Sequence, residues 1–230
     1  MSLEADRTRL LDILRTLSFE RRQVILASGR ESDFYIDCKR TALTAEGHVL
    51  IGRLLFDRVR KIQPLVRGVG GLTLGADPIG SAIALTSFLE YERLRTQGQP
   101  AEAAPAPQGA PKHERAFGAS TDLEGAGGAG GKYPPGTVDS FIVRKEPKGH
   151  GTGQWIEGRK TIPDGSRVIV LEDVVTTGGS ALKAIERCRA EKLEPVACLA
   201  LVDRAEGGRE AIEAQGVPLQ SLFTRKDFIP

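Results

Sequence analysis

Two adjacent carboxylates and a turn of small residues form the part of this chain that is best suited to chemistry. Glu172 and Asp173 follow an apolar run, and after two valines a turn of threonines, glycines and a serine extends from Thr176 to Ser180. Glycines let the backbone approach an anion closely, and the hydroxyl groups add hydrogen-bond donors around it. Carboxylate oxygens accept hydrogen bonds from vicinal ribose hydroxyls and can hold the water shell of a magnesium ion. The segment therefore predicts a site for a phosphorylated ribose.

A purely structural explanation of the same residues is weaker. Acids are favoured near a helix N-terminus by the helix dipole, and threonine or serine caps such a terminus. That explanation does not account for the acid pair, the glycines and the hydroxyls together. A Walker A phosphate loop would need a lysine before Ser180, where Gly179 stands, so a nucleoside triphosphatase is disfavoured.

The sequence around this segment supplies the elements that must position it. Residues 168–171 are aliphatic without a break, as expected of a central parallel strand buried on both faces, and ligands of such sheets bind beyond the carboxyl ends of the strands. The alternation along the chain predicts an α/β fold, a central parallel sheet flanked by helices. We expect further strands at residues 65–69, 140–143 and 196–202, and helices at residues 4–17, 44–60, 78–91 and 181–192.

Length and composition predict one domain spanning residues 1–230. The chain is 40% hydrophobic with a net charge of +2, which allows one good core and gives no basic stripe for nucleic acid. No apolar stretch approaches a membrane span and no signal pattern opens the chain, so we expect a cytoplasmic protein without membrane contact. Cys38, Cys188 and Cys198 lack metal-ligand spacing and are expected to be free thiols, the last two in the core.

Residues 92–137 differ in composition from the rest of the chain. Glycine, alanine and proline dominate there, so we interpret the segment as a low-complexity, disordered insertion without a catalytic role. Its glycine run at residues 125–130 superficially matches a dinucleotide-binding pattern, but no strand precedes it and we reject the match. The glycine-rich residues 68–75 follow a plausible strand and are expected to line a pyrophosphate site.

A second segment with chemical potential follows the expected strand at residues 140–143. Its loop carries Arg144, Lys145, Lys148 and His150 among glycines. A run of charges is most often a solvated surface. In a glycine-flanked loop, however, such cations could close over an anionic leaving group.

The acid-and-glycine segment closely resembles the 5-phosphoribosyl-1-pyrophosphate (PRPP) binding motif of type I phosphoribosyltransferases. Together with the cationic loop and residues 28–30, 33–37 and 201–204, it makes nearly the whole chain outside the insertion resemble the orotate phosphoribosyltransferase family. The resemblance implies a Mg²⁺-dependent transfer of ribose 5-phosphate from PRPP to orotate, giving orotidine 5′-phosphate and pyrophosphate in pyrimidine (UMP) biosynthesis. It further implies a small N-terminal hood region, a flexible catalytic loop and a homodimer with shared active sites.

The resemblance also implies individual roles. The catalytic residues would be Lys148, Arg144, Lys145, His150 and Asp173. PRPP would be bound by Arg144, Lys145, Lys148, His150, Glu172, Asp173, Val174, Val175, Thr176, Thr177, Gly178, Gly179 and Ser180. Orotate would be bound by Thr176, Arg204, Phe34 and Tyr35, and the guanidinium of Arg204 suits the carboxylate of orotate because a planar fork can bind two oxygens. No residue would bind metal directly, since Mg²⁺ would be held through PRPP and water near Glu172 and Asp173.

Two positions depart from the family pattern, and two rival functions stay open. Ala27 and Gly75 stand where many relatives carry lysine, so Mg²⁺ and the cationic loop would have to balance more of the pyrophosphate charge. The rivals are a phosphoribosyltransferase for another base and a non-catalytic PRPP-sensing regulator; Arg204 argues against the first and the cationic loop against the second. Residues 37–40 fit an extension of the sugar-phosphate site and an exposed charged turn equally well.

Overall fold

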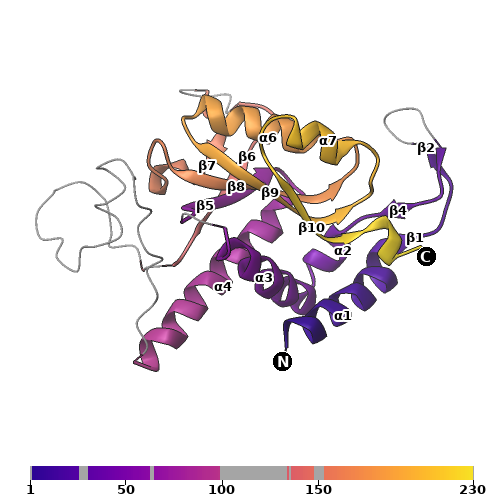
Figure 1. Cartoon of the computed structure of the whole chain (residues 1–230), viewed down its shortest axis with the longest axis horizontal. Coiled ribbons are helices and arrows are strands. Elements are labelled where there is room, and N and C mark those ends of the chain that lie inside the picture. Colours follow the sequence, from indigo (N-terminus) through magenta and orange to yellow (C-terminus); the bar gives the residue numbers. More distant parts are fainter. Residues whose placement is uncertain are drawn as a thin grey trace, which may run out of the picture.

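The computed structural model describes residues 2–25, 31–62, 65–98, 134, 136–147 and 153–229. A six-stranded sheet in the order β10-β9-β8-β5-β6-β7 forms its centre (Figure 1). All neighbouring strands are parallel except β6 and β7, which form an antiparallel pair. The strands are β5 (Gly68–Leu72), β6 (Asp139–Val143), β7 (Ile156–Glu157), β8 (Arg167–Val175), β9 (Glu194–Asp203) and β10 (Leu219–Thr224).

Helices cover both faces of this sheet, as the sequence predicts. In Figure 1, α6 and α7 lie on one face, whereas α1, α3 and α4 lie on the other. The helices are α1 (Leu3–Ile13), continued by a π-helical turn η1 (Leu14–Ser18), then α2 (Lys39–Ala42), α3 (Ala45–Val59), α4 (Ala76–Thr96), α6 (Gly179–Ala190) and α7 (Gly208–Glu213). Two short 3₁₀ turns complete the set, η2 (Arg159–Thr161) and η3 (Arg225–Asp227).

The central strand β8 is buried on both faces, as its uninterrupted aliphatic run predicts. Because side chains alternate along a strand, Ile169 and Leu171 pack with the helices α1, α3 and α4, whereas Val168 and Val170 pack with α6 and α7. The cysteines are free and buried, so the expectation of core thiols is confirmed for Cys188 and Cys198. Burial raises the pKa of the Cys188 thiol to about 12.

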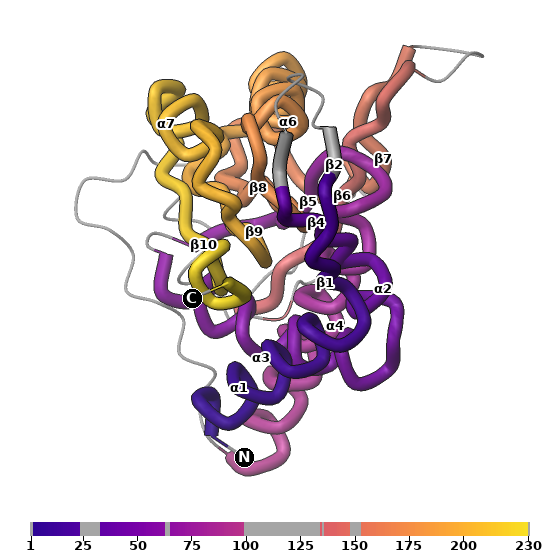
Figure 2. Tube along the Cα trace, turned by 90° about the vertical axis from the view of Figure 1, so that its right-hand side faces the viewer, coloured from indigo at the N-terminus to yellow at the C-terminus, as the bar shows by residue number. Residues whose placement is uncertain are grey.

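A small region at the N-terminus packs against the chain's last described turn and corresponds to the expected hood. It contains the antiparallel pairs β1 (Phe19–Glu20) with β4 (Tyr35–Ile36) and β2 (Val24–Ile25) with β3 (Glu31–Ser32). The rings of Phe19, Phe34 and Phe228 lie 5.0 to 5.6 Å apart by their centroids. Arg225 of η3 also forms an ion pair with Asp33. The C-terminal end thus holds the hood beside the sheet, as Figure 2 shows in the turned view.

Some boundaries differ from the expectations. The helix expected at residues 78–91 begins at Ala76 and continues to Thr96, so residues 92–96 are helical rather than part of a disordered segment. The C-terminal turns of α4 are stabilised by two ion pairs, Glu90–Arg93 and Glu92–Arg95. The expected helix end was placed too early because it was set by the loss of apolar residues, and charged residues also form helices. The strand expected at residues 65–69 lies at Gly68–Leu72. Among the described residues, no helix is both long enough and apolar enough to cross a membrane.

Candidate functional site

The candidate site lies where three parallel strands end. Strands β5, β8 and β9 are neighbours in the sheet, and their carboxyl ends lead into residues 73–75, 176–178 and 204–207. The Cα register pairs Val175 with Asp203, and the backbone N–H of Arg204 donates to the carbonyl of Val175 at 2.9 Å. The structure therefore brings Arg204 beside the start of the predicted phosphate loop, although the two are far apart in sequence.

The predicted phosphate loop is a tight turn that leads directly into α6. Gly178, with a φ of 82°, serves as the N-cap of the helix, so Gly179 and Ser180 of the predicted loop already belong to the first turn of α6. The first amide groups of any α-helix have no partner within the helix and can face an anion. Thr177, Gly179 and Ser180 are exposed, so an anion could reach this end of α6 from solvent.

Gly208 supports the phosphate loop from behind and was missed by the sequence reasoning. A Cβ atom at this position would lie 2.6 Å from the Thr176 carbonyl oxygen and 2.9 Å from the Gly178 amide nitrogen. The start of α7 can therefore lie this close to the loop only because residue 208 is glycine. The signal in the sequence is the Gly207–Gly208 pair that follows Arg204.

The two adjacent acids have different surroundings. Glu172 is only 6% exposed, and burial together with the nearby charge of Asp173 raises the pKa of Glu172 well above its usual range. Asp173 is held by hydrogen bonding and packing: its Oδ1 accepts from the Val174 amide at 2.9 Å, and its Oδ2 lies 3.8 Å from the Lys39 ammonium. The pair therefore offers one carboxyl that resists ionisation beside one that faces a cation.

The turn after β5 packs on this acid pair. A Cβ atom at Gly75 would lie 2.5 Å from Asp173 Oδ1, so position 75 has no room for a side chain unless the carboxylate moves. The Thr73 hydroxyl donates to Asp77 Oδ2 at 2.6 Å and ties the turn to the first turn of α4. A lysine at position 75, as the resemblance would lead one to expect, would therefore displace the Asp173 carboxylate.

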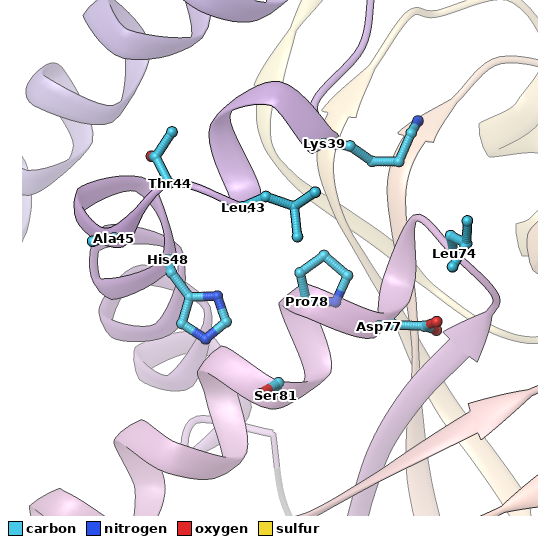
Figure 3. A pocket seen from close by; sticks show the side chains of 9 residues that line it. All are labelled: Lys39, Leu43, Thr44, Ala45, His48, Leu74, Asp77, Pro78 and Ser81. Atoms are coloured by element: carbon cyan, nitrogen blue, oxygen red, sulfur yellow. The ribbon is translucent and has the colours of Figure 1, made fainter.

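A cavity of about 630 Å³ adjoins this turn (Figure 3). Residues of α2, the start of α3, the turn after β5 and the start of α4 line it. They are Lys39, Leu43, Thr44, Ala45, His48, Leu74, Asp77, Pro78 and Ser81. Lys39 lines this cavity and also lies near Asp173, so the cavity adjoins the candidate site.

Arg204 is fixed by an acid that the sequence reasoning did not single out. Its Nη2 and Nε lie 2.9 and 3.1 Å from the same carboxylate oxygen of Glu206, and both side chains are largely buried. The guanidinium also lies over the Phe34 ring, 5.2 Å from its centroid. The acid two residues after the arginine was the available signal. Glu206 and Phe34 thus orient the guanidinium.

The two aromatic residues predicted to flank the base differ in exposure. Phe34 is fully buried among the rings of the hood and packs beneath Arg204. Tyr35 is partly exposed, and the Arg22 guanidinium lies 4.0 Å from its ring centroid. Phe34 thus lies beside Arg204 and Tyr35 beside Arg22. Direct contact of either ring with a base stays a prediction.

Only part of the predicted cationic loop falls within the described residues. Arg144 and exposed Lys145 follow β6, whereas Lys148 and His150 lie outside the described part of the chain. The Arg144 amide donates to the Trp155 carbonyl at 2.9 Å, and its guanidinium lies 3.2 Å from Glu157 of β7. These two cations thus stand on a β6–β7 hairpin at one margin of the sheet, which projects from the body of the molecule in Figure 2.

Comparisons with known proteins agree with this geometry. A family model described as the phosphoribosyl transferase domain matches residues 136–216, which include β8, the phosphate loop and Arg204. Fold and site together define a phosphoribosyltransferase.

More specific relatives match nearly the whole chain. Orotate phosphoribosyltransferase from Sorangium cellulosum is 42% identical over 98% of this chain and 94% of the relative, and that from Aquifex aeolicus is 39% identical over 89% and 85%. The crystal structure of the Mycobacterium tuberculosis enzyme in complex with PRPP has a TM-score of 0.63 at 32% identity, covering 97% of this chain and 98% of the other. The chain belongs to the orotate phosphoribosyltransferase family. The predicted family and fold class are thereby confirmed.

Proposed function

We propose that the carboxyl end of β8 binds PRPP and that the chain transfers its ribose 5-phosphate to N1 of orotate. The products are orotidine 5′-phosphate and pyrophosphate, formed in the cytoplasm during de novo pyrimidine biosynthesis. The observation that carries this proposal is the acid pair Glu172 and Asp173 set directly before the tight loop and N-terminus of α6. The acids suit ribose hydroxyls, and the loop from Thr176 to Ser180 suits the 5-phosphate.

Orotate would lie between the phosphate loop and the hood. Its carboxylate would bind the guanidinium of Arg204, which the ion pair with Glu206 orients, while the Arg204 backbone amide is hydrogen-bonded to Val175 at the start of the phosphate loop. A base without a carboxylate would leave this largely buried guanidinium without its substrate partner. The site therefore favours orotate over uracil or a purine.

The cations on the hairpin would act on the leaving group. As the bond at C1 breaks, negative charge grows on pyrophosphate, and nearby cations stabilise the transition state more than the ground state. Arg144 and Lys145 are two such cations, and the sequence predicts the same role for Lys148 and His150. Orotate is already anionic, so the reaction needs no strong base.

The donor atoms of this site are of the kind that suits Mg²⁺. The carboxyl oxygens of Glu172 and Asp173 are the hard oxygen donors that Mg²⁺ prefers. Within the described ranges, however, no group of three or more His, Cys, Asp and Glu side chains is placed to hold a metal ion. We therefore propose that Mg²⁺ is held by oxygens of PRPP and by water near these two acids. When bound, it neutralises charge on pyrophosphate.

A second copy of the chain would cover an apolar surface on α3 and α4. Leu85 and Leu89 of α4 are 54% and 59% exposed, and Val49 of α3 and Leu43 are exposed as well. Helical spacing places Leu85 and Leu89 on the same face as Pro78 and Ser81, which line the cavity. Because large exposed apolar patches mark interaction sites, this face supports a homodimer.

The dimer can be tested by charge substitution. Leu89→Glu should convert a dimer to a monomer in sedimentation velocity. Leu65→Glu is the matched control, because Leu65 is also about half exposed but lies before the N-terminal end of β5, whereas α4 follows the C-terminal end of that strand. A wild-type monomer, or equal dissociation by both variants, would contradict the proposed surface.

Shared sites can be tested by mixing inactive subunits. Lys148→Ala and Arg204→Ala remove residues assigned to the leaving group and to orotate. If Lys148 acts in the partner's site, a mixed dimer contains one intact site of its two. Each mixed dimer should then regain up to half of the activity of a wild-type dimer. Failure to regain activity despite subunit exchange would mean that each subunit uses its own loop.

The transfer itself is tested by its product. Purified protein with PRPP, orotate and Mg²⁺ should form orotidine 5′-phosphate, identified by mass spectrometry, and excess EDTA should stop its formation. Formation of ribose 5-phosphate without the nucleotide would contradict the proposed function.

A further inference from the structure

Lys39 is the first residue of α2 and stands beside the acids of the candidate site. We propose that Lys39 is a positioning residue for Asp173, anchored by Asp37, and that it tunes the affinity of the site for PRPP. The inference rests on PRPP binding as proposed above. Of residues 37–40, whose two interpretations the sequence left open, it assigns Asp37 and Lys39 to the substrate site.

Asp37 holds Lys39 at two points. Asp37 Oδ1 accepts from the Lys39 backbone amide at 3.2 Å and from its ammonium at 2.7 Å. An exposed lysine has many rotamers, and these two contacts restrict it to an orientation in which the side chain extends from α2 toward the sheet (Figure 3). The hydrogen bond to Asp37 raises the pKa of Lys39, so its charge persists.

Asp173 is the group toward which this ammonium is held. One side of its carboxylate is fixed, because Oδ1 accepts from the Val174 amide and packs against Gly75. The other oxygen, Oδ2, lies 3.8 Å from the Lys39 Nζ. The Val174 amide, Gly75 and the Lys39 ammonium therefore restrict the orientation in which the Asp173 carboxylate can meet the ribose hydroxyls.

Lys39 also sets the charge of the surroundings. Glu172, Asp173 and Asp37 are three acids close to where a highly anionic substrate would bind. Without Lys39, less of the negative charge of Asp37 and Asp173 would be balanced, so these carboxylates would repel PRPP more strongly and PRPP would bind more weakly. A lysine that served only an exposed turn would affect stability slightly and PRPP affinity not at all.

The test is calorimetric titration of the full-length protein with PRPP and Mg²⁺, without orotate. Lys39→Gln should weaken PRPP binding about tenfold and raise the KM for PRPP by a similar factor, while kcat at saturating PRPP falls less than threefold. Lys39→Arg keeps the charge and should restore binding to within about threefold of wild type. Arg40→Gln is the matched control, because Arg40 is the next residue and pairs instead with Glu20 of the hood, at 2.6 Å; its affinity should stay within twofold.

Two results would overturn the inference. One is Lys39→Gln binding PRPP within twofold of wild type. The other is an equal loss of affinity in Lys39→Gln, Lys39→Arg and Arg40→Gln together with lowered melting temperatures, which would assign the turn a structural role. Failure of the wild-type protein to bind PRPP would instead contradict the proposed function, so the two failures are distinguishable.

Discussion

Gly75 lies directly against the carboxylate of Asp173, close enough that a Cβ atom at position 75 would meet Asp173 Oδ1 at 2.5 Å. The turn after β5 and the acid at the end of β8 therefore fit together only while residue 75 has no side chain. This contact joins the predicted pyrophosphate side of the site to its ribose side. It also explains why this chain cannot carry a lysine at position 75 without moving Asp173.

Gly75→Ala should displace Asp173 and weaken PRPP binding. Overpacking of this kind costs about 1–3 kcal/mol, and the misplaced carboxylate should raise the KM for PRPP roughly tenfold. Steady-state kinetics and chemical denaturation measure the two effects. Gly179→Ala is the control for stability, because a Cβ atom there meets nothing within 4 Å, and it should not destabilise the protein. An unchanged KM for PRPP in Gly75→Ala would show that Asp173 is not held by this contact.

The buried acid Glu172 predicts a pH-dependent stability. Its pKa in the folded protein is raised above 4.5 by burial and by Asp173. Because Glu172 binds its proton more tightly in the folded protein, it contributes fully to stability when the pH is below its pKa in the unfolded chain. This contribution is lost as the pH rises through the pKa of Glu172 in the folded protein. Without ligands, Glu172→Gln should therefore gain stability relative to wild type between neutral and alkaline pH, by on the order of 1 kcal/mol.

Urea denaturation at several pH values measures this effect, and Glu186→Gln on the exposed side of α6 serves as the control. The Glu172→Gln variant should also bind PRPP more weakly, since it lacks the carboxylate. Parallel pH profiles for wild type and Glu172→Gln would contradict the assignment of the raised pKa.

Arg204→Lys should reduce affinity for orotate more than affinity for PRPP. A lysine keeps the charge but loses the planar fork, and it cannot reproduce both contacts with Glu206. The expected loss is about 1.5–3 kcal/mol, seen as a tenfold or larger rise in the KM for orotate. The KM for PRPP is the internal control and should change less than threefold. An equal rise in both constants would remove Arg204 from orotate recognition.

Lys148→Ala should mainly lower turnover. By its resemblance to the family's catalytic loop, Lys148 contacts pyrophosphate as its charge grows, and the loss of one charged hydrogen bond costs about 1.5–3 kcal/mol, roughly tenfold to over a hundredfold in kcat. Lys160→Ala on η2 removes an exposed lysine elsewhere and should retain wild-type turnover. If both variants turn over like wild type, Lys148 is not part of the mechanism.

The local part of the site could be predicted because it is continuous in sequence. The strand, the acid pair, the small-residue turn and the helix all lie between Arg167 and Ala190, and each has a clear residue pattern. The α/β class followed from the alternation of apolar strands and helices, which is also a local signal.

The contacts between distant segments could not be predicted. Gly75 on Asp173, Lys39 beside the same acid, and Gly208 behind the phosphate loop all depend on how neighbouring strand ends meet. Strand order and the exact course of the turns decide these contacts, and neither leaves a periodic pattern. The end of α4 was misjudged for another reason: residues 92–96 are helical through charged residues and ion pairs, whereas the prediction relied on apolar content.

The measurement that tests the account most directly is the loss of orotate's ultraviolet absorbance when PRPP and Mg²⁺ are added to the purified protein. Uracil, adenine and hypoxanthine are assayed in parallel. The account predicts a loss of signal with orotate that requires protein, PRPP and Mg²⁺ together, and no turnover of the other three bases. Turnover of another base in place of orotate would contradict the assigned specificity, and PRPP binding without turnover of any base would indicate a sensor rather than an enzyme.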